Sequence, residues 1–172
     1  MATLFDATDY GPAFAEVLSQ DRRRPLSGGV PGAEDQRTLS RLTRDAAFAH
    51  TSVFDPEAAD CCLAACWLLV DDLARSHVIS QSIGSAEGSW WHGVMHRREG
   101  DFGNAKYWFR QVGKHPGASQ LAERHGGWEH AGFVDACQRA VSRGEGLEDC
   151  LDRQQSEWEC LFDWCYAKAV RA

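Results

Sequence analysis

Three histidines and a glutamate stand at spacings that suit metal or acid–base chemistry. His92 and His96 are four residues apart, so on a helix their imidazoles lie on one face and can share one ion. Glu99 follows on the same stripe, and His77 belongs to a preceding helical segment that a short connection folds back against it. The pattern predicts a partly enclosed polar pocket lined by these four residues, with catalytic roles for all of them.

One interpretation of this group is a metal site. His92 and His96, together with His77 or Glu99, would bind a divalent ion and leave positions open for water or oxygen. Histidine and carboxylate ligands suit iron, zinc or manganese. The chain lacks the glutamate that H-E-x-x-H places between its histidines, so the metalloprotease motif is absent.

A second interpretation needs no metal. One of the two helical histidines would act as a general base on a small molecule. Arg97, Arg98 or Lys106 would hold an anionic substrate, and Trp91 with its aromatic neighbours would wall a pocket for a flat ligand.

A third interpretation gives the histidines no chemistry. Histidines in helical cores are usually hydrogen-bonded packing residues, and Arg97, Arg98 and Glu99 would form ion pairs on a solvated face. The protein would then be a helical interaction module, which should expose an apolar groove of about several hundred Å². Its seven tryptophans also allow a homodimer that buries some of them.

The elements that position these side chains are predicted to be helices. Asp55 and Ser85 are typical N-caps, Pro56 suits a first helical turn, and Gly100 suits a helix end. The predicted helices cover residues 10–18, 55–79, 85–99, 102–112, 119–124, 133–142 and 147 to near the C-terminus. Two prolines and three glycines make residues 22–38 a loop or mobile segment.

The expected fold is all-α: a compact single domain over residues 1–172, with about six or seven helices. Residues 61–70 are apolar all round, so their helix should be the buried centre of the bundle. This run of ten residues is too short to span a bilayer.

Charge and cysteine content exclude several classes of function. The 172 residues carry 18 Lys and Arg against 25 Asp and Glu, a net charge of −7, which disfavours binding to nucleic acid or an anionic membrane.

The seven cysteines form no C-x-x-C pair, and most lie among apolar residues at helical spacing, so we expect reduced thiols in the core. The N-terminus has no signal-peptide pattern, which predicts a soluble, cytoplasmic protein.

Residues 93–116, GVMHRREGDFGNAKYWFRQVGKHP, resemble a single tetratricopeptide-like helical hairpin. No second copy of this hairpin motif follows at a period of about 34 residues, so no repeat array is expected. The hairpin resemblance implies that His92 and His96, placed around Gly93, pack against the second helix. Residues 76–116 are also similar to an uncharacterised helical family with a W-H-G-x-M-H-R-R segment, and this resemblance implies no activity.

Overall fold

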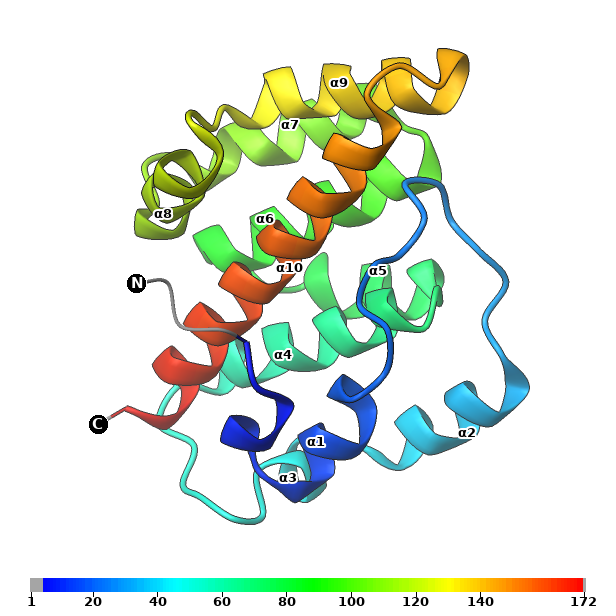
Figure 1. The fold of residues 1–172 in the computed structure, drawn as a ribbon. Coiled ribbons are helices and arrows are strands. Elements are labelled where there is room, and N and C mark those ends of the chain that lie inside the picture. Colours follow the sequence, from blue (N-terminus) through cyan, green and yellow to red (C-terminus); the bar gives the residue numbers. More distant parts are fainter. Residues whose placement is uncertain (1–4, 172) are drawn as a thin grey trace.

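The computed structural model describes residues 5–171, and every regular element in that range is a helix (Figure 1). The elements are η1 (Ala7–Tyr10), α1 (Pro12–Leu18), α2 (Ala33–Arg41), α3 (Arg44–Ala47), α4 (Pro56–Leu69), α5 (Leu73–Ser80), α6 (Ala86–Glu99), α7 (Phe102–Val112), α8 (Pro116–His125), α9 (His130–Arg143) and α10 (Leu147–Val170). The all-α prediction is confirmed. None of the described helices is both long and apolar enough to cross a membrane.

The predicted number of six or seven helices was too low, because ten α-helices form between residues 5 and 171. Part of the difference lies in residues 22–38, which were predicted to be loop throughout. Residues 33–38 are instead the first turns of α2. Proline and glycine occur only up to Gly32, the acids Glu34 and Asp35 favour a helix start, and the buried Leu39 anchors the helix.

The helix predicted over 55–79 is two helices. Asp55 caps α4 as expected, with its carboxylate accepting the Ala58 N–H at 3.0 Å. The chain then turns at Asp71, whose φ is +63°, and Asp72 caps α5. Asp71 and Asp72 interrupt the apolar run at this corner, but two acids also fit the polar face of a longer amphipathic helix, so the hydrophobic pattern alone did not identify the break.

The two central helices are α4 and α6. Nearly every side chain of α4 from Ala58 onward is buried, as the all-apolar run predicted, and α4 packs against α5, α6 and α10. The long helix α10 crosses the molecule diagonally in Figure 1. Helix α6 lies against α4, α5 and α7 and is buried on all sides, which places polar side chains of α6 inside the fold.

Helices α6 and α7 form the hairpin expected from the sequence. Ser85 caps α6 by accepting the Gly88 N–H at 3.2 Å, and Gly100 ends it with φ +89°. A Cβ at Gly93 would lie 3.0 Å from the ring of Phe109 on α7. A glycine at position 93 therefore lets the two helices approach closely.

The first turn of α6 is held by a buried carboxylate. Glu87 is 5% exposed and accepts hydrogen bonds from Trp164 Nε1 at 3.1 Å and Lys168 Nζ at 3.2 Å, while His115 Nε2 lies 3.5 Å away. Burial alone would raise the pKa of the Glu87 carboxyl. The nearby His115 ring, the backbone N–H of Glu87 and the hydrogen bonds from Lys168 outweigh burial and hold this pKa well below its usual 4.5. The carboxylate ties α6 to α8 and α10.

Glu87→Gln is expected to lower the free energy of unfolding by about 2 kcal/mol at pH 7, because the charged acceptor is lost. A carboxyl whose pKa is depressed by folding stabilises the protein above its unfolded-state pKa, and this contribution fades as the pH falls below about 4.5. The difference between wild type and variant should therefore shrink from pH 7 to pH 3, measured by urea unfolding. A difference that stays constant over this range would show that Glu87 is not the acid-sensitive group.

Candidate metal centre

The structure brings His77 of α5 together with His92 and His96 of α6. Ring centroids are 4.8 Å apart for His77 and His92, 5.4 Å for His77 and His96, and 4.8 Å for His92 and His96. One ring nitrogen from each residue lies within 4.8 Å of the others. The expected convergence of His77 on the α6 pair is confirmed, and the three histidines form a cluster that could hold a metal ion.

Burial distinguishes this cluster from a surface group of histidines. His92 is 2% exposed and His96 is 8% exposed, while His77 is half-buried at the side where the cluster meets solvent. Both ring nitrogens of His92 are buried and have no hydrogen-bond partner. An unpaired polar atom inside a protein costs free energy, so His92 is held in a place where packing alone would favour an apolar ring.

The surroundings of His92 keep its imidazole neutral. Burial, together with the neighbouring His96 and His77 rings, lowers the pKa of His92 to about 4. The ring of Trp108 on α7 stacks on His92 with centroids 4.0 Å apart. At neutral pH His92 therefore offers a lone pair, which is the form that binds a metal ion.

His96 already has an orienting partner. Its Nδ1 lies 3.0 Å from a carboxylate oxygen of Glu99, which is 55% exposed at its side chain. When Nδ1 donates to this carboxylate, Nε2 of His96 is left free to coordinate. A carboxylate on the far nitrogen of a ligating histidine is a recurrent feature of metal sites, where it fixes the ring and raises its basicity.

The dimensions suit one transition-metal ion after a small adjustment. Three nitrogens that bind zinc at about 2.0–2.1 Å in tetrahedral geometry lie about 3.4 Å from one another. The observed spread of up to 4.8 Å requires side-chain rotations that bring the most distant nitrogens about 1.4 Å closer. No other group of three or more histidine, cysteine or acidic side chains within residues 5–171 has ligand atoms this close together.

The three cations assigned to an anionic substrate point elsewhere. Arg97 and Arg98 are 1% and 3% exposed, and each is paired with a buried carboxylate on another element. The ion pairs are Arg97–Glu157, Arg98–Asp71 and Lys106–Asp135. These side chains are therefore occupied in holding helices together rather than grouped around the histidines.

Of the aromatic residues near the hairpin, Trp108 rather than Trp91 contacts the histidines. Trp91 is fully buried, and its ring meets Trp158 of α10 edge-on at 6.0 Å. The sequence pattern favoured Trp91 for the pocket wall and grouped Trp108 among its aromatic neighbours. In an antiparallel hairpin that turns at residues 100–101, position 108 lies opposite position 92, and this symmetry is the signal that identifies it.

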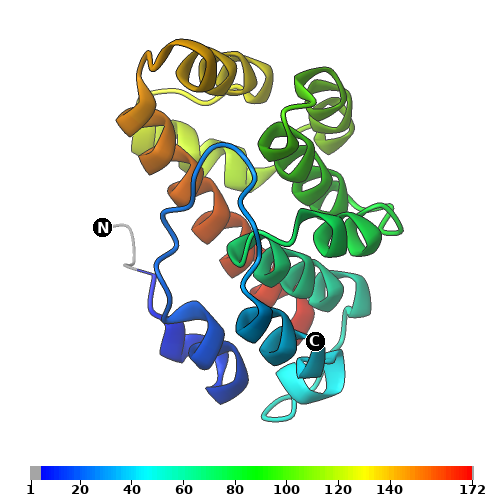
Figure 2. The same ribbon diagram turned by 90° about the vertical axis from the view of Figure 1, so that its right-hand side faces the viewer.

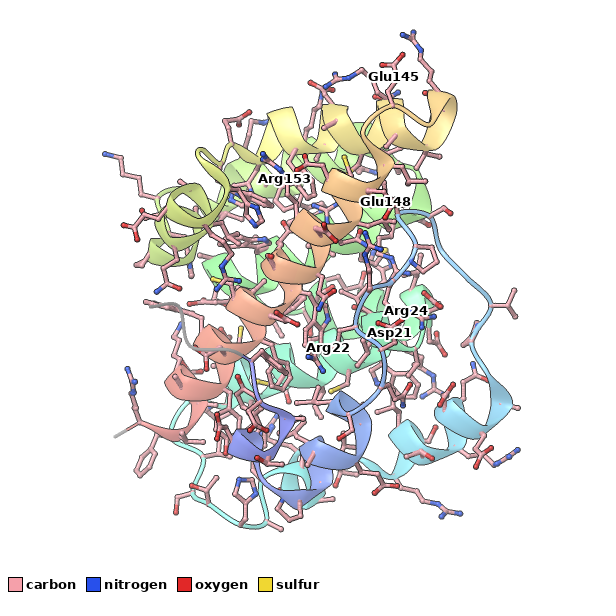
Figure 3. All side chains as sticks on the ribbon, viewed as in Figure 1. Asp21, Arg22, Arg24, Glu145, Glu148 and Arg153 are labelled. Atoms are coloured by element: carbon pink, nitrogen blue, oxygen red, sulfur yellow. The ribbon has the colours of Figure 1, made fainter. Side chains whose placement is uncertain are left out.

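The glycine-rich connection after α8 forms a separate surface pocket. Trp128, Phe133 and Arg153 line a hollow of about 470 Å³ between the start of α9 and α10. The labelled Arg153 in Figure 3 marks its edge on α10. None of its lining residues belongs to the histidine cluster, and the helix predicted from residue 133 begins earlier, with His130 as the first residue of α9.

Comparisons with known proteins add no functional information to this geometry. No protein-family model matches the chain, and neither curated proteins nor solved structures give a match. Any functional conclusion must therefore be built on the side chains themselves.

Proposed function

We propose that the protein binds a divalent transition-metal ion through His77, His92 and His96, with zinc as the preferred ion and iron or manganese as the alternatives. The observation that carries the proposal is the pair of buried, unpartnered nitrogens of His92 between two further imidazoles. A bound ion would satisfy one of these nitrogens and repay the cost of burying the ring. Three neutral nitrogen donors favour zinc over the harder manganese ion.

The metal-free interpretation has less support. An acid–base site for an anionic substrate needs a cation beside the base, and Arg97, Arg98 and Lys106 are each engaged in an ion pair away from the cluster. The acids Glu99 and Asp101 stand at the end of α6 and the start of α7 instead. Acidic side chains close to His96 suit a metal cation and a neutral or cationic small ligand better than an anionic one.

The interaction-module interpretation also has less support. The large exposed apolar side chains are spread over different elements rather than gathered on one face. They are Val30, Phe54, Val78, Tyr107, Val141 and Leu147. The homodimer remains a prediction, which size-exclusion chromatography with light scattering would test.

An ion held by three imidazoles retains at least one position for a further ligand, where it supplies Lewis-acid chemistry. The chain's own residues would do the remaining work. Glu99 would hold the orientation of His96, and Trp108 would cover His92 and keep water from the back of the site. A small molecule would reach the ion past the half-buried His77.

Elemental analysis of protein purified without a metal-binding tag is the direct test. We expect about one zinc per chain. We also expect the cobalt-substituted protein to show the visible absorption bands of a cobalt ion with few ligands, bound by nitrogen. Apoprotein that takes up neither zinc nor cobalt at micromolar concentration would disprove the proposal. If the protein contains iron or manganese in place of zinc, the metal site is supported and only the choice of zinc is wrong.

Glu99→Ala is expected to weaken zinc binding about tenfold while leaving stability nearly unchanged. The variant loses the carboxylate that orients His96, and removal of such a partner costs metal affinity about 10–100-fold. An exposed substitution changes stability by about 0.5 kcal/mol at most. Glu123→Ala, an exposed acid on α8, is the matched control and should bind zinc as the wild type does. Equal zinc affinity in both variants would contradict the claim that Glu99 orients His96 for metal binding.

A further inference from the structure

A long arm, residues 19–32, connects α1 to α2 without regular structure and runs beside α10 before it turns back to α2 (Figures 1 and 2). Gln154 on α10 donates to the carbonyl oxygens of Arg24 at 2.9 Å and Pro25 at 3.2 Å. Leu26 is buried in a small apolar cluster with residues of α9 and α10. In Figure 3 the labelled Arg22 and Arg24 mark the course of the arm across this face. The arm is therefore held at several points along its length.

The corner between α4 and α5 adopts a conformation that usually needs glycine. Asp71 has φ +63°, the only positive φ outside glycine among residues 5–171. Asp71 N–H bonds to Leu68 O at 3.2 Å and Asp72 N–H to Trp67 O at 3.0 Å, the paired bonds of a Schellman helix end. A side chain in this conformation costs free energy, so other contacts must hold Asp71 in place.

Two arginines provide those contacts. Arg24 of the arm and Arg98 of α6 each bind one carboxylate oxygen of Asp71, which is 6% exposed. Arg98 also donates to Leu68 O at 2.6 Å and to Pro25 O at 3.2 Å. One guanidinium thus joins the arm, the end of α4 and α6.

The arm lies against this corner at van der Waals distance. Gly28 N–H donates to Arg98 O at 2.7 Å. A Cβ at Gly29 would lie 2.7 Å from the Asp71 carboxylate, and one at Gly28 would lie 2.7 Å from Leu73, the first residue of α5. A larger residue at Gly28 or Gly29 would make the Leu73 or Asp71 side chain shift, so the two adjacent glycines favour this close approach.

The corner is directly connected to the histidine cluster. Helix α5, which carries His77, begins two residues after Asp71, and Arg98 follows His96 by two residues on α6. Movement of the corner changes the position of His77 relative to the α6 histidines. The contacts of Asp71 therefore lie at the junction between the helices that carry the ligands.

We propose that residues 19–32 are a latch that sets the affinity of the histidine cluster for its metal, acting through Arg24, Asp71 and Arg98. The inference rests on the proposed metal site. Asp71 and both arginines are positioning residues, because they touch neither the ion nor its ligands. Coupling of binding equilibria is reciprocal, so metal binding must also hold the latch closed.

Cobalt titration followed in the visible spectrum, with zinc competition, tests the first direction. Arg24→Gln should weaken the affinity about tenfold, within the usual range for coupled sites, and Arg24→Lys should recover part of the loss. Arg23→Gln is the matched control, because Arg23 pairs only with the exposed acids Glu148 and Asp152 on α10. Wild type that binds no cobalt overturns the metal site and the latch together. Equal affinity of wild type and Arg24→Gln overturns the latch and leaves the metal site standing.

Hydrogen exchange tests the reverse direction without any arm substitution. The Gly28 amide, which bonds to Arg98 O, should exchange about tenfold more slowly when zinc is added, and His92→Phe should abolish this response. The Gly127 amide, bonded to Ala122 O in a loop far along the chain, is the internal control. Equal zinc-dependent slowing of both amides would indicate global stabilisation and overturn the latch.

Discussion

His92→Phe is expected to abolish zinc binding and to raise the melting temperature of the metal-free protein. The variant loses one of three ligands, and it also removes two buried nitrogens that have no partner in the structure. A phenyl ring has nearly the shape of imidazole and can stack on Trp108, which lies 4.0 Å from the present ring. A residue placed for binding rather than packing is one whose replacement stabilises the fold.

The two effects have opposite signs, which makes the experiment decisive. Relief of the unpaired polar atoms should add about 1–2 kcal/mol, or about 2–8 °C in a protein of this size. Zinc at about 100 times its dissociation constant should stabilise the wild type by about 2.7 kcal/mol, which is about 5–10 °C. Calorimetry with and without zinc measures both. The variant should melt at one temperature whether or not zinc is present.

His130→Phe is the matched control. His130 is also a largely buried histidine with an unpartnered Nε2 and a stacked aromatic neighbour, Phe109, at 4.8 Å. It lies outside the cluster, so its variant should keep the full zinc-dependent rise in melting temperature. His92→Phe that melts several degrees lower and still responds to zinc would show that His92 is a packing residue. His96→Phe should also lose zinc, with a smaller gain in stability, because His96 already has Glu99 as a partner.

Glu157→Leu is expected to cost about 3–5 kcal/mol of unfolding free energy, the largest loss predicted for a single substitution in this fold. Arg97 and Glu157 form a fully buried ion pair at 2.5 Å between α6 and α10, with side chains 0% and 1% exposed. Glu157 also accepts the Trp90 N–H at 3.0 Å. Without the carboxylate, a charged guanidinium stays in the core, and its Nε and Nη1 already lack partners.

A second substitution separates the lost charge pair from simple loss of packing. Arg97 lies over the ring of Phe133 at 4.6 Å, so an apolar side chain suits the same space. The double variant Arg97→Met/Glu157→Leu should recover stability to within about 1–2 kcal/mol of wild type, because paired replacement of a buried ion pair is often neutral. Urea unfolding measures both variants. A loss below about 1 kcal/mol for Glu157→Leu would mean that the pair is not isolated from solvent.

Short-range patterns in the sequence were sufficient for the helices that carry the site. Ser85 caps α6 and Gly100 ends it where expected, and α7 begins at residue 102 as predicted, because capping depends on residues within one turn of each other. The stripe of His92, His96 and Glu99 follows from helical spacing alone. The convergence of His77 followed from the short connection before α6, which folds the preceding helical segment back against it.

Only the tertiary structure decided which neighbours these side chains would have. The sequence placed Arg97 and Arg98 beside a substrate, but their partners, Glu157 and Asp71, are 60 and 27 residues away along the chain. Such pairings depend on how helices stack rather than on local spacing. The same holds for the break at Asp71, which requires an arm that approaches from residues 24–29. Residue types at helical spacing determined that three imidazoles could meet, whereas packing decided that one of them, His92, is left buried with no partner.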